Sequence, residues 1–356
     1  MLVHFVILKT AFFFLLINRF LEMEGTNHPL HIPLSYPWLI ICDGKDQERQ
    51  TFVDISNNKF NTGTISEMRN KTICTSTREW LVLKDLGSKD LCLLNLTSKE
   101  VVQLPRLDSI ADYDICVLSS PSSESKHDFH VMFIDHSRCK FYFCQPGDMK
   151  FREQMFEFHW ENGKTTICAA TLFGEKVYFL AWFSGQSPIY ELFCAEFVGS
   201  NLHFTKITRE NLPSPTTPEI NRINDYLVEC GGELLFIHKM CGGWEANTLL
   251  GFLIFRMDFS SQVWVQVSNI GGWTIFLSQH LNVGRKAISC FAAEKGIRQN
   301  SIYFTKCFDR FLYVFDVEDH SISNSLPCPI VSKHYSRLDW VMIPTTRASE
   351  LCYDSA

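Results

Sequence analysis

The stretch EWLVLKDLGSKDLCLLNLTSKEVVQLP, residues 79–105, decides the fold of this chain. It contains three short apolar runs, WLVLKD, LCLLN and VVQL, separated by the turn residues Gly87-Ser88 and Thr97-Ser98-Lys99. Short apolar runs bounded by such turns predict β-strands, and turns of this length join antiparallel neighbours. The stretch therefore predicts a three-stranded meander of about 25 residues, which is most of one propeller blade.

The same pattern returns along the chain. The first strands of its six copies begin at Trp38, Trp80, Phe129, Val177, Leu234 and Ile302. These positions lie 42, 49, 48, 57 and 68 residues apart, and a propeller repeat is typically roughly 40–50 residues long. We therefore expect an all-β fold, a β-propeller of about six blades with short antiparallel meanders, and inserted loops in the last two repeats.

Further segments supply a fourth strand for several blades. The candidates are DICVLSS at 114–120, TTICAATLF at 165–173, DYLVECG at 225–231 and AISCFAA at 287–293, and RLDWVMIP at 337–344 is suited to close the ring. The segment LPSPTTP at 212–218 predicts a linker, because three prolines in seven residues do not fit a strand ladder.

Two segments, 240–247 and 271–285, are predicted to be the longest inserted loops. Each carries a tryptophan directly after a glycine pair, Trp244 and Trp273. A tryptophan exposed on a loop is typical of a binding hot spot. Packing of the same side chain between blades is an equally good explanation.

Composition excludes some classes of function. The net charge is −6 and no cluster of Lys and Arg stands out, so we expect no nucleic-acid partner. The 14 cysteines are scattered singly, several of them inside apolar strand patterns such as ELFCAEF, which predicts buried reduced thiols and a reducing compartment. The first expectation for localisation is therefore the cytoplasm or the nucleus.

The N-terminal run LVHFVILKTAFFFLLINRF, residues 2–20, resembles the apolar core of a signal peptide. Lys9 interrupts the run, no small-residue cleavage site follows Ile17, and the uninterrupted apolar part is far below the ~20 residues of a spanning helix. The sequence therefore favours an intracellular location over secretion, and a membrane anchor is not indicated. The sequons at Asn70 and Asn95 would matter only in a secreted protein.

The sequence shows no nucleotide-binding loop and no zinc-protease, serine-hydrolase or kinase signature, so we expect neither an enzyme nor a cofactor. The metal-capable side chains that lie closest together are His127, His130, His136, Cys139 and Cys144. Alternation along a strand directs Cys139 and Cys144 to opposite faces, which argues against a tetrahedral metal site. Acidic pairs such as Asp112 and Asp114, or Glu318 and Asp319, lie beside turn residues and are expected to cap turns.

Several fragments point to one family. They are EWLVLKD, LLNLTSKEVVQLPRL, CVLSS, FCQPGD, DYLVECGGELLFIHK, FRMDFSSQVWVQV, SIYFT and VFDVEDHSI, in this order between residues 38 and 344. Together they resemble the plant F-box-associated, kelch-like β-propeller family of the KIB type. We accordingly divide the chain into an N-terminal segment, 1–37, a KIB-type propeller, 38–345, and a tail, 346–356.

The resemblance implies a propeller that binds a protein partner, because in this family the propeller captures the target while an F-box docks on the Skp1 subunit of a cullin ubiquitin ligase. Residues 1–37 lack the L-P-x-x-[LI] start of an F-box. We therefore expect a non-catalytic protein-interaction module without its own F-box, linked at most indirectly to a Skp1-cullin ligase. Two alternatives stay open: a fragment of a full-length F-box adaptor, and a secreted carbohydrate-binding or glycosidase propeller.

Overall fold

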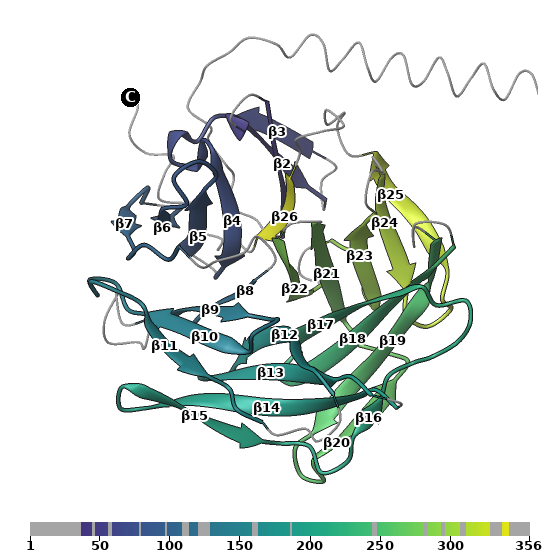
Figure 1. Cartoon of the computed structure of the whole chain (residues 1–356). Coiled ribbons are helices and arrows are strands. Elements are labelled where there is room, and N and C mark those ends of the chain that lie inside the picture. Colours follow the sequence, from purple (N-terminus) through teal and green to yellow (C-terminus); the bar gives the residue numbers. More distant parts are fainter. Residues whose placement is uncertain are drawn as a thin grey trace, which may run out of the picture.

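The computed structural model is a six-bladed β-propeller, viewed along its central channel in Figure 1. It describes residues 37–44, 47–55, 59–77, 80–96, 98–108, 114–119, 129–158, 163–185, 187–243, 248–280, 283–292, 296–306, 311–327 and 337–341. Within these ranges every regular element is a strand, apart from one 3-10 turn at Ser66–Met68. The all-β propeller of about six blades that the repeats predict is confirmed.

Each blade is one small sheet, with its strands named from the channel outward. Blade 1 contains β26 (Arg337–Val341), β1 (Trp38–Asp43), β2 (Arg49–Asp54) and β3 (Lys59–Gly63). Blade 2 contains β4 (Lys71–Ser76), β5 (Trp80–Asp85), β6 (Leu91–Asn95) and β7 (Val101–Gln103). Blade 3 contains β8 (Ile115–Leu118), β9 (Val131–Asp135), β10 (Lys140–Cys144) and β11 (Arg152–Met155).

The second half of the ring has longer strands. Blade 4 contains β12 (Thr165–Phe173), β13 (Lys176–Phe183), β14 (Ile189–Val198) and β15 (Asn201–Lys206), with the short β16 (Leu212–Pro213) beside β14. Blade 5 contains β17 (Arg222–Cys230), β18 (Glu233–Gly242), β19 (Thr248–Asp258) and β20 (Val263–Val267). Blade 6 contains β22 (Val283–Phe291), β21 (Trp273–His280), β23 (Ser301–Thr305), β24 (Phe311–Asp316) and β25 (Ile322–Pro327).

The continuous apolar runs of the sequence follow from the burial of both faces of each sheet. In β5, Trp80 and Val82 pack with side chains of blade 3, whereas Leu81 and Leu83 pack with side chains of blade 1. A strand buried on both faces needs apolar residues at every position rather than at alternate ones. The run WLVL therefore marks a strand between two neighbouring blades.

The ring closes where the last strand pairs with the first. β26 is antiparallel to β1, with Leu39 opposite Trp340 and Trp38 opposite Val341. Trp340 is 2% exposed and its ring lies 4.7 Å from that of Phe276 in blade 6. The prediction that RLDWVMIP closes the ring is confirmed, and strands from the two ends of the propeller share one sheet.

Blade 6 departs from a simple meander, and one prediction for this blade is wrong. Residues 271–285 were expected to form a loop, but β21 occupies most of this segment and its Ile275, Phe276 and Leu277 are fully buried. β21 is antiparallel to β22 and parallel to β23, so it separates two strands that a meander would pair directly. As a result β22 is displaced toward the channel, where it contacts β8 of the opposite blade.

The proline-rich segment 212–218 was also predicted incorrectly in part. Leu212 and Pro213 form β16 and pair with Tyr190 and Ile189 at the outer side of β14. Pro213 is tolerated because a short edge strand can leave the missing N–H directed away from the ladder. The inner strand of blade 2, β4, was not predicted, whereas the candidates at 114–120, 165–173, 225–231 and 287–293 coincide with β8, β12, β17 and β22.

The N-terminal segment 1–36 and residues 342–356 lie outside the described residues, so the domain boundaries stay predictions. Within the described ranges, no helix has the length and apolar character needed to cross a membrane.

The closing seam makes a specific prediction. We expect Trp340→Ala to lower the free energy of unfolding by about 3–5 kcal/mol, because it removes a large buried ring from the contact between blades 1 and 6. Urea unfolding followed by tryptophan fluorescence measures the change. Val198→Ala, at a position that is 64% exposed, is the control and should stay within about 0.5 kcal/mol of wild type. A loss below about 1 kcal/mol for Trp340→Ala would contradict a closing role for this side chain.

Candidate functional site

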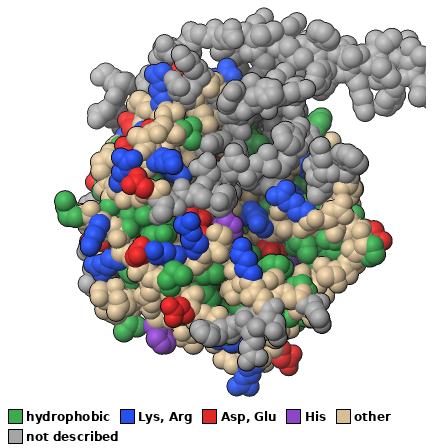
Figure 2. Space-filling model, viewed as in Figure 1, with side chains coloured by type: hydrophobic (Ala, Val, Ile, Leu, Met, Phe, Trp, Pro, Cys, Tyr) green, Lys and Arg blue, Asp and Glu red, His purple; other side chains and the backbone are tan. Residues whose placement is uncertain are grey.

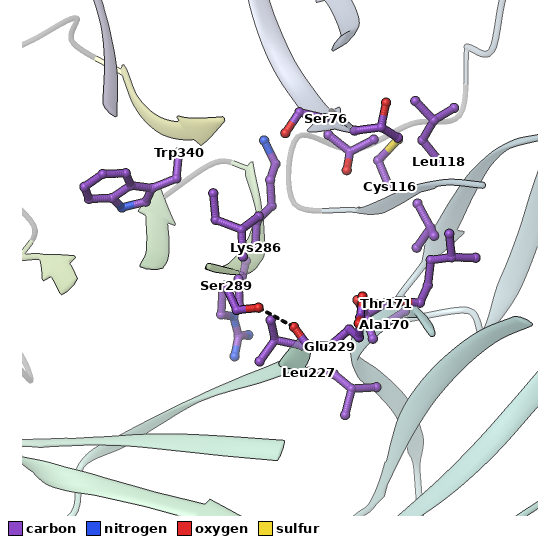
Figure 3. Close-up of a pocket in the computed structure, with 18 of the residues that line it drawn as sticks. Ser76, Cys116, Leu118, Ala170, Thr171, Leu227, Glu229, Lys286, Ser289 and Trp340 are labelled. Carbon is purple, nitrogen blue, oxygen red and sulfur yellow. Dashed lines mark hydrogen bonds between the residues drawn. The ribbon is translucent and has the colours of Figure 1, made fainter. Parts of the chain in front are cut away.

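A cavity of about 610 Å³ runs along the central channel beside β22. Its wall combines the ends of β4, β12 and β17 with β8, β22 and Trp340 of β26, so all six blades contribute to it. Figure 3 shows Lys286 and Ser289 on one side of the hollow and Cys116, Leu118 and Thr171 on the other. The fold thus brings together residues that are up to 265 positions apart, from Thr75 to Trp340.

The wall of the cavity is more polar than its side chains suggest. β4, β8, β12, β17 and β22 each pair with a neighbour on one side only, so they are edge strands whose other side faces the channel. Backbone N–H and C=O groups along such an edge need partners from water or a ligand. Hydroxyl groups add to this supply at Thr75, Ser76, Thr77, Thr171 and Ser289, the last of which donates a 2.6 Å hydrogen bond to the Glu229 carbonyl oxygen.

Two adjacent cations on β22 line the cavity and differ in their surroundings. Lys286 Nζ forms an ion pair of 2.9 Å with Asp339 and donates a 2.5 Å hydrogen bond to the Ile73 carbonyl oxygen, which ties β22 to blades 1 and 2. Arg285 is half-buried, and no carboxylate of the described residues lies within ion-pair distance of its guanidinium. The acidic residue of the wall is Glu229, which is exposed.

An aromatic pair lies at the end of β22, where Trp273 and Phe291 meet with ring centroids 5.7 Å apart. Gly231, with φ +66°, leaves the space that the indole needs, because a Cβ there would come within 2.7 Å of Trp273 Nε1. Trp273 also borders a second cavity of about 360 Å³ beside the ion pair of Arg256 and Glu233. Trp273 therefore lies on a strand and is half-buried, which agrees with packing rather than with a fully exposed loop position.

We call the face on which the inner strands end the bottom face, and the opposite face the top face. In blades 2 to 5 the strands alternate in direction, so the turns after the first and third strands reach the bottom face together. In blade 6, where β21 is parallel to β23, the strands that end on this face are β22 and β24. The exposed apolar side chains on this face include Met149 (94% exposed), Val198 (64%), Phe259 (39%) and Phe291 (40%). Phe259 stacks on Phe173 at 5.5 Å, which joins turns of blades 4 and 5.

Charge is mixed on the surface. The face seen in Figure 2 carries Lys and Arg side chains interspersed with Asp, Glu and hydrophobic ones. The net charge of the chain is −6. A large field of one sign, which would attract a polyanion, is not seen in this view.

The His and Cys residues that the sequence singled out do not converge. His130 stacks on Phe197 at 3.9 Å, Cys139 packs in the core between blades 3 and 4, and Cys144 packs in the core between blades 2 and 3. The expected opposite orientation of Cys139 and Cys144 is confirmed, and His127 lies outside the described residues.

His136 instead lies near two aspartates, with its Nδ1 3.5 Å from Asp114 Oδ1 and Asp135 close by. Asp135 Oδ1 accepts hydrogen bonds from the backbone N–H groups of Ser137 and Arg138, so this carboxylate is occupied in capping a turn. Asp316 caps the turn that contains Glu318 and Asp319 in the same way. Asp112 lies outside the described residues.

Sequence reasoning missed a buried group between blades 4 and 5. Asp225 on β17 lies 2.8 Å from His238 Nδ1 on β18 and accepts a 3.1 Å hydrogen bond from the Tyr190 hydroxyl on β14. His238 is 0% exposed and is surrounded by the rings of Tyr190, Phe236 and Phe255. A His–Asp pair resembles a catalytic dyad, but this one is enclosed by aromatic side chains, and its role is to hold two blades together.

The described cysteines form no disulfide with one another, and ten of the eleven are buried, as the sequence predicted. Burial raises the pKa of Cys139 and Cys194 to about 11, and that of Cys144 and Cys230 to about 12. These thiols are therefore protonated at neutral pH and act as small apolar side chains.

Comparison with known proteins identifies one family model that matches, the KIB1-4 beta-propeller, over residues 52–328. No curated protein sequence matches the chain. Among solved structures, a putative 6-phosphogluconolactonase from Bacteroides fragilis is 13% identical, with a TM-score of 0.31 over 71% of this chain and 70% of that one. The tricorn protease (10% identity, TM-score 0.37, 88% of this chain and 31% of that one) and YjhT (10%, 0.35, 88% and 99%) are similar at the same level.

The buried Asp225 group generates a stability prediction. We expect Asp225→Ala to lower the free energy of unfolding by about 3 kcal/mol, because two buried polar groups, the Tyr190 hydroxyl and the His238 ring, lose their acceptor. Urea unfolding measures the loss. Asp90→Ala removes an exposed carboxylate and should leave the unfolding midpoint at its wild-type value. Equal midpoints for the two variants would show that Asp225 does not hold the blades together.

The raised thiol pKa values predict slow alkylation. At pH 8 a thiol of pKa about 11 is ionised in only about one molecule in a thousand, and the thiolate is the reactive form. We expect the peptides containing Cys139, Cys144, Cys194 and Cys230 to stay unmodified by iodoacetamide in the native protein and to react fully in guanidinium chloride. Peptide mass spectrometry reads out each site. Rapid native labelling of Cys194 would contradict its buried, protonated state.

Proposed function

Since the chain belongs to the KIB1-4 beta-propeller family, we propose that it is a non-catalytic protein-interaction module whose bottom face receives the partner. The exposed apolar side chains on the bottom face carry this proposal. Aromatic and methionine side chains supply most of the binding energy in many protein interfaces. Phe259, Phe291 and Met149 provide such side chains on a rigid frame.

The architecture supports a binding role in a second way. Both faces of each sheet are used for packing between blades, which leaves the turns at the two ends of the ring free to vary. A turn such as the one after β19 can change its sequence without disturbing the core. Turns on a rigid closed ring can therefore bind a partner without a conformational change of the propeller.

The finer proposal follows the resemblance of the sequence to plant F-box-associated propellers. The partner is a protein in the cytoplasm or the nucleus, and the link to a Skp1-cullin ubiquitin ligase is indirect, through another chain. The buried reduced thiols favour such a compartment. The mixed surface charge favours a protein partner over nucleic acid.

The experiment is affinity purification of the tagged chain from plant cells, with mass spectrometry of the partners. We expect specific partners to be retained by wild type and lost, by at least about tenfold, from the double variant Phe259→Ala/Phe291→Ala, because truncating hot-spot aromatics commonly costs this much.

Phe311→Ala is the matched control, because Phe311 is as exposed as Phe291, at 40%, but begins a strand that ends on the bottom face and so lies on the top face. Loss of the same partners from the control would place recognition elsewhere. Retention of every partner by the double variant would overturn the assignment to the bottom face. Recovery of Skp1 or cullin subunits would support the link to a ligase.

A further inference from the structure

Arg285 is the cation of the channel cavity that forms no ion pair with a carboxylate of the described residues. Its neighbour Lys286 is held by Asp339 and by the Ile73 carbonyl oxygen, so that pair contributes no net charge. Among the described residues no carboxylate comes within ion-pair distance of Arg285, and Asp225, a buried carboxylate on β17, is already engaged by His238 and Tyr190. The cavity interior is therefore positively charged next to Arg285.

The position of Arg285 also matters. Ser289 lies four residues further along β22 and contacts Glu229, so the level of Arg285 is roughly 13 Å from the level of Glu229. Arg285 is thus placed toward the end of β22 that lies on the top-face side, and Glu229 lies near the bottom face with Trp273 and Phe291. The cation and the carboxylate of the wall are separated along the channel axis.

Hydroxyl groups and the backbone of strand edges line the cavity between Arg285 and Glu229. Thr75, Ser76 and Thr77 end β4, and Thr171 lies near the end of β12, all on the cavity wall. A volume of about 610 Å³ falls within the range of small-molecule sites, about 300–1,000 Å³. The cavity offers one cation, several hydroxyl groups, free backbone edges and an aromatic pair at its mouth.

We propose that the channel cavity binds a small organic anion that carries several hydroxyl groups. Its carboxylate or phosphate group pairs with the Arg285 guanidinium, which presents a fork of donors suited to either group. Its hydroxyl groups bond to Ser76, Thr171 and the strand edges between the two ends of the cavity. Glu229, at the other end of the cavity, repels the anionic group, so the anion is oriented with its charged group toward Arg285.

This inference is independent of the proposed protein partner, because the partner binds side chains of the bottom face and the anion binds inside the channel. The insertion of β21 makes the site specific to this ring, since it is the displacement of β22 that brings Arg285 into the channel. Phe291 borders both sites, so the two proposals are told apart by Phe259, which lies on the bottom face and does not line the cavity, and by Arg285, which lines the cavity.

The test is isothermal titration of the purified full chain with four probes at about 0.15 M salt, an ionic strength at which exposed charges are screened beyond about 8 Å. Glucose 6-phosphate and glucuronate combine an anionic group with hydroxyl groups, and they distinguish phosphate from carboxylate. Glucose supplies hydroxyl groups alone, and inorganic phosphate supplies the anion alone. We expect at least one of the two organic anions to bind at least about tenfold more tightly than glucose and inorganic phosphate, because only these anions use both halves of the site.

Variants then locate the site. Arg285→Gln should weaken binding of the preferred organic anion at least about tenfold, the usual loss for a charge-assisted hydrogen bond. Arg152→Gln is the matched control, because it makes the same change in charge at an exposed position on the outer strand of blade 3 and should bind like wild type. Ser76→Ala, which should weaken binding several-fold, carries the test if Arg285→Gln fails to fold by circular dichroism.

Three results would overturn the proposal. They are failure of both organic anions to bind at about 10 mM, a concentration that detects even weak ligands, equally tight binding of inorganic phosphate, and wild-type affinity in both Arg285→Gln and Ser76→Ala. Loss of affinity in Arg285→Gln with retention in Arg285→Lys would support recognition by charge at this position.

Discussion

The pairing of β26 with β1 is the interaction on which the rest of the structure depends. Every sheet of the ring buries both faces against its neighbours, so an open seam would expose apolar faces of blades 1 and 6 together. The seam is hydrogen bonded over five residue pairs and is filled by Trp340, whose ring packs on Phe276. Closure also removes two sheet edges that would otherwise attract other strands. The channel, and with it the cavity, exists only because the ring is closed.

The fold was largely accessible from sequence because burial on both faces leaves a strong local signal. Runs such as WLVL and LCLLN mark their strands without any knowledge of the partner sheet. β4 was missed because its sequence KTICTS is short and half polar, as suits a strand that faces the channel. β21 was missed because the glycine pair before Trp273 was interpreted as the start of a loop, and no local feature reveals that a strand is inserted between two others.

The candidate site was far less accessible, because its residues come from strands that are distant in sequence. Arg285 and Lys286 resemble ordinary surface charges in the segment VGRKAIS, and only the insertion of β21 carries them into the channel. Thr75 and Thr171 lie on inner strands of different blades, so the sequence alone does not show that they line the same cavity. Likewise, Asp225 and His238 lie 13 residues apart on paired strands. They are neighbours because of the register of β17 and β18, which the sequence alone does not show.

The closing seam also has a consequence for biosynthesis. β1 leaves the ribosome early, but its partner β26 follows about 300 residues later, which at ~5–20 residues per second takes roughly 15–60 s. During this interval the apolar strand WLIICD has one unpaired edge, and blade 1 has no neighbour on its blade 6 side. The nascent propeller is therefore an incomplete ring until translation is nearly finished, and its first blade is the last to be completed.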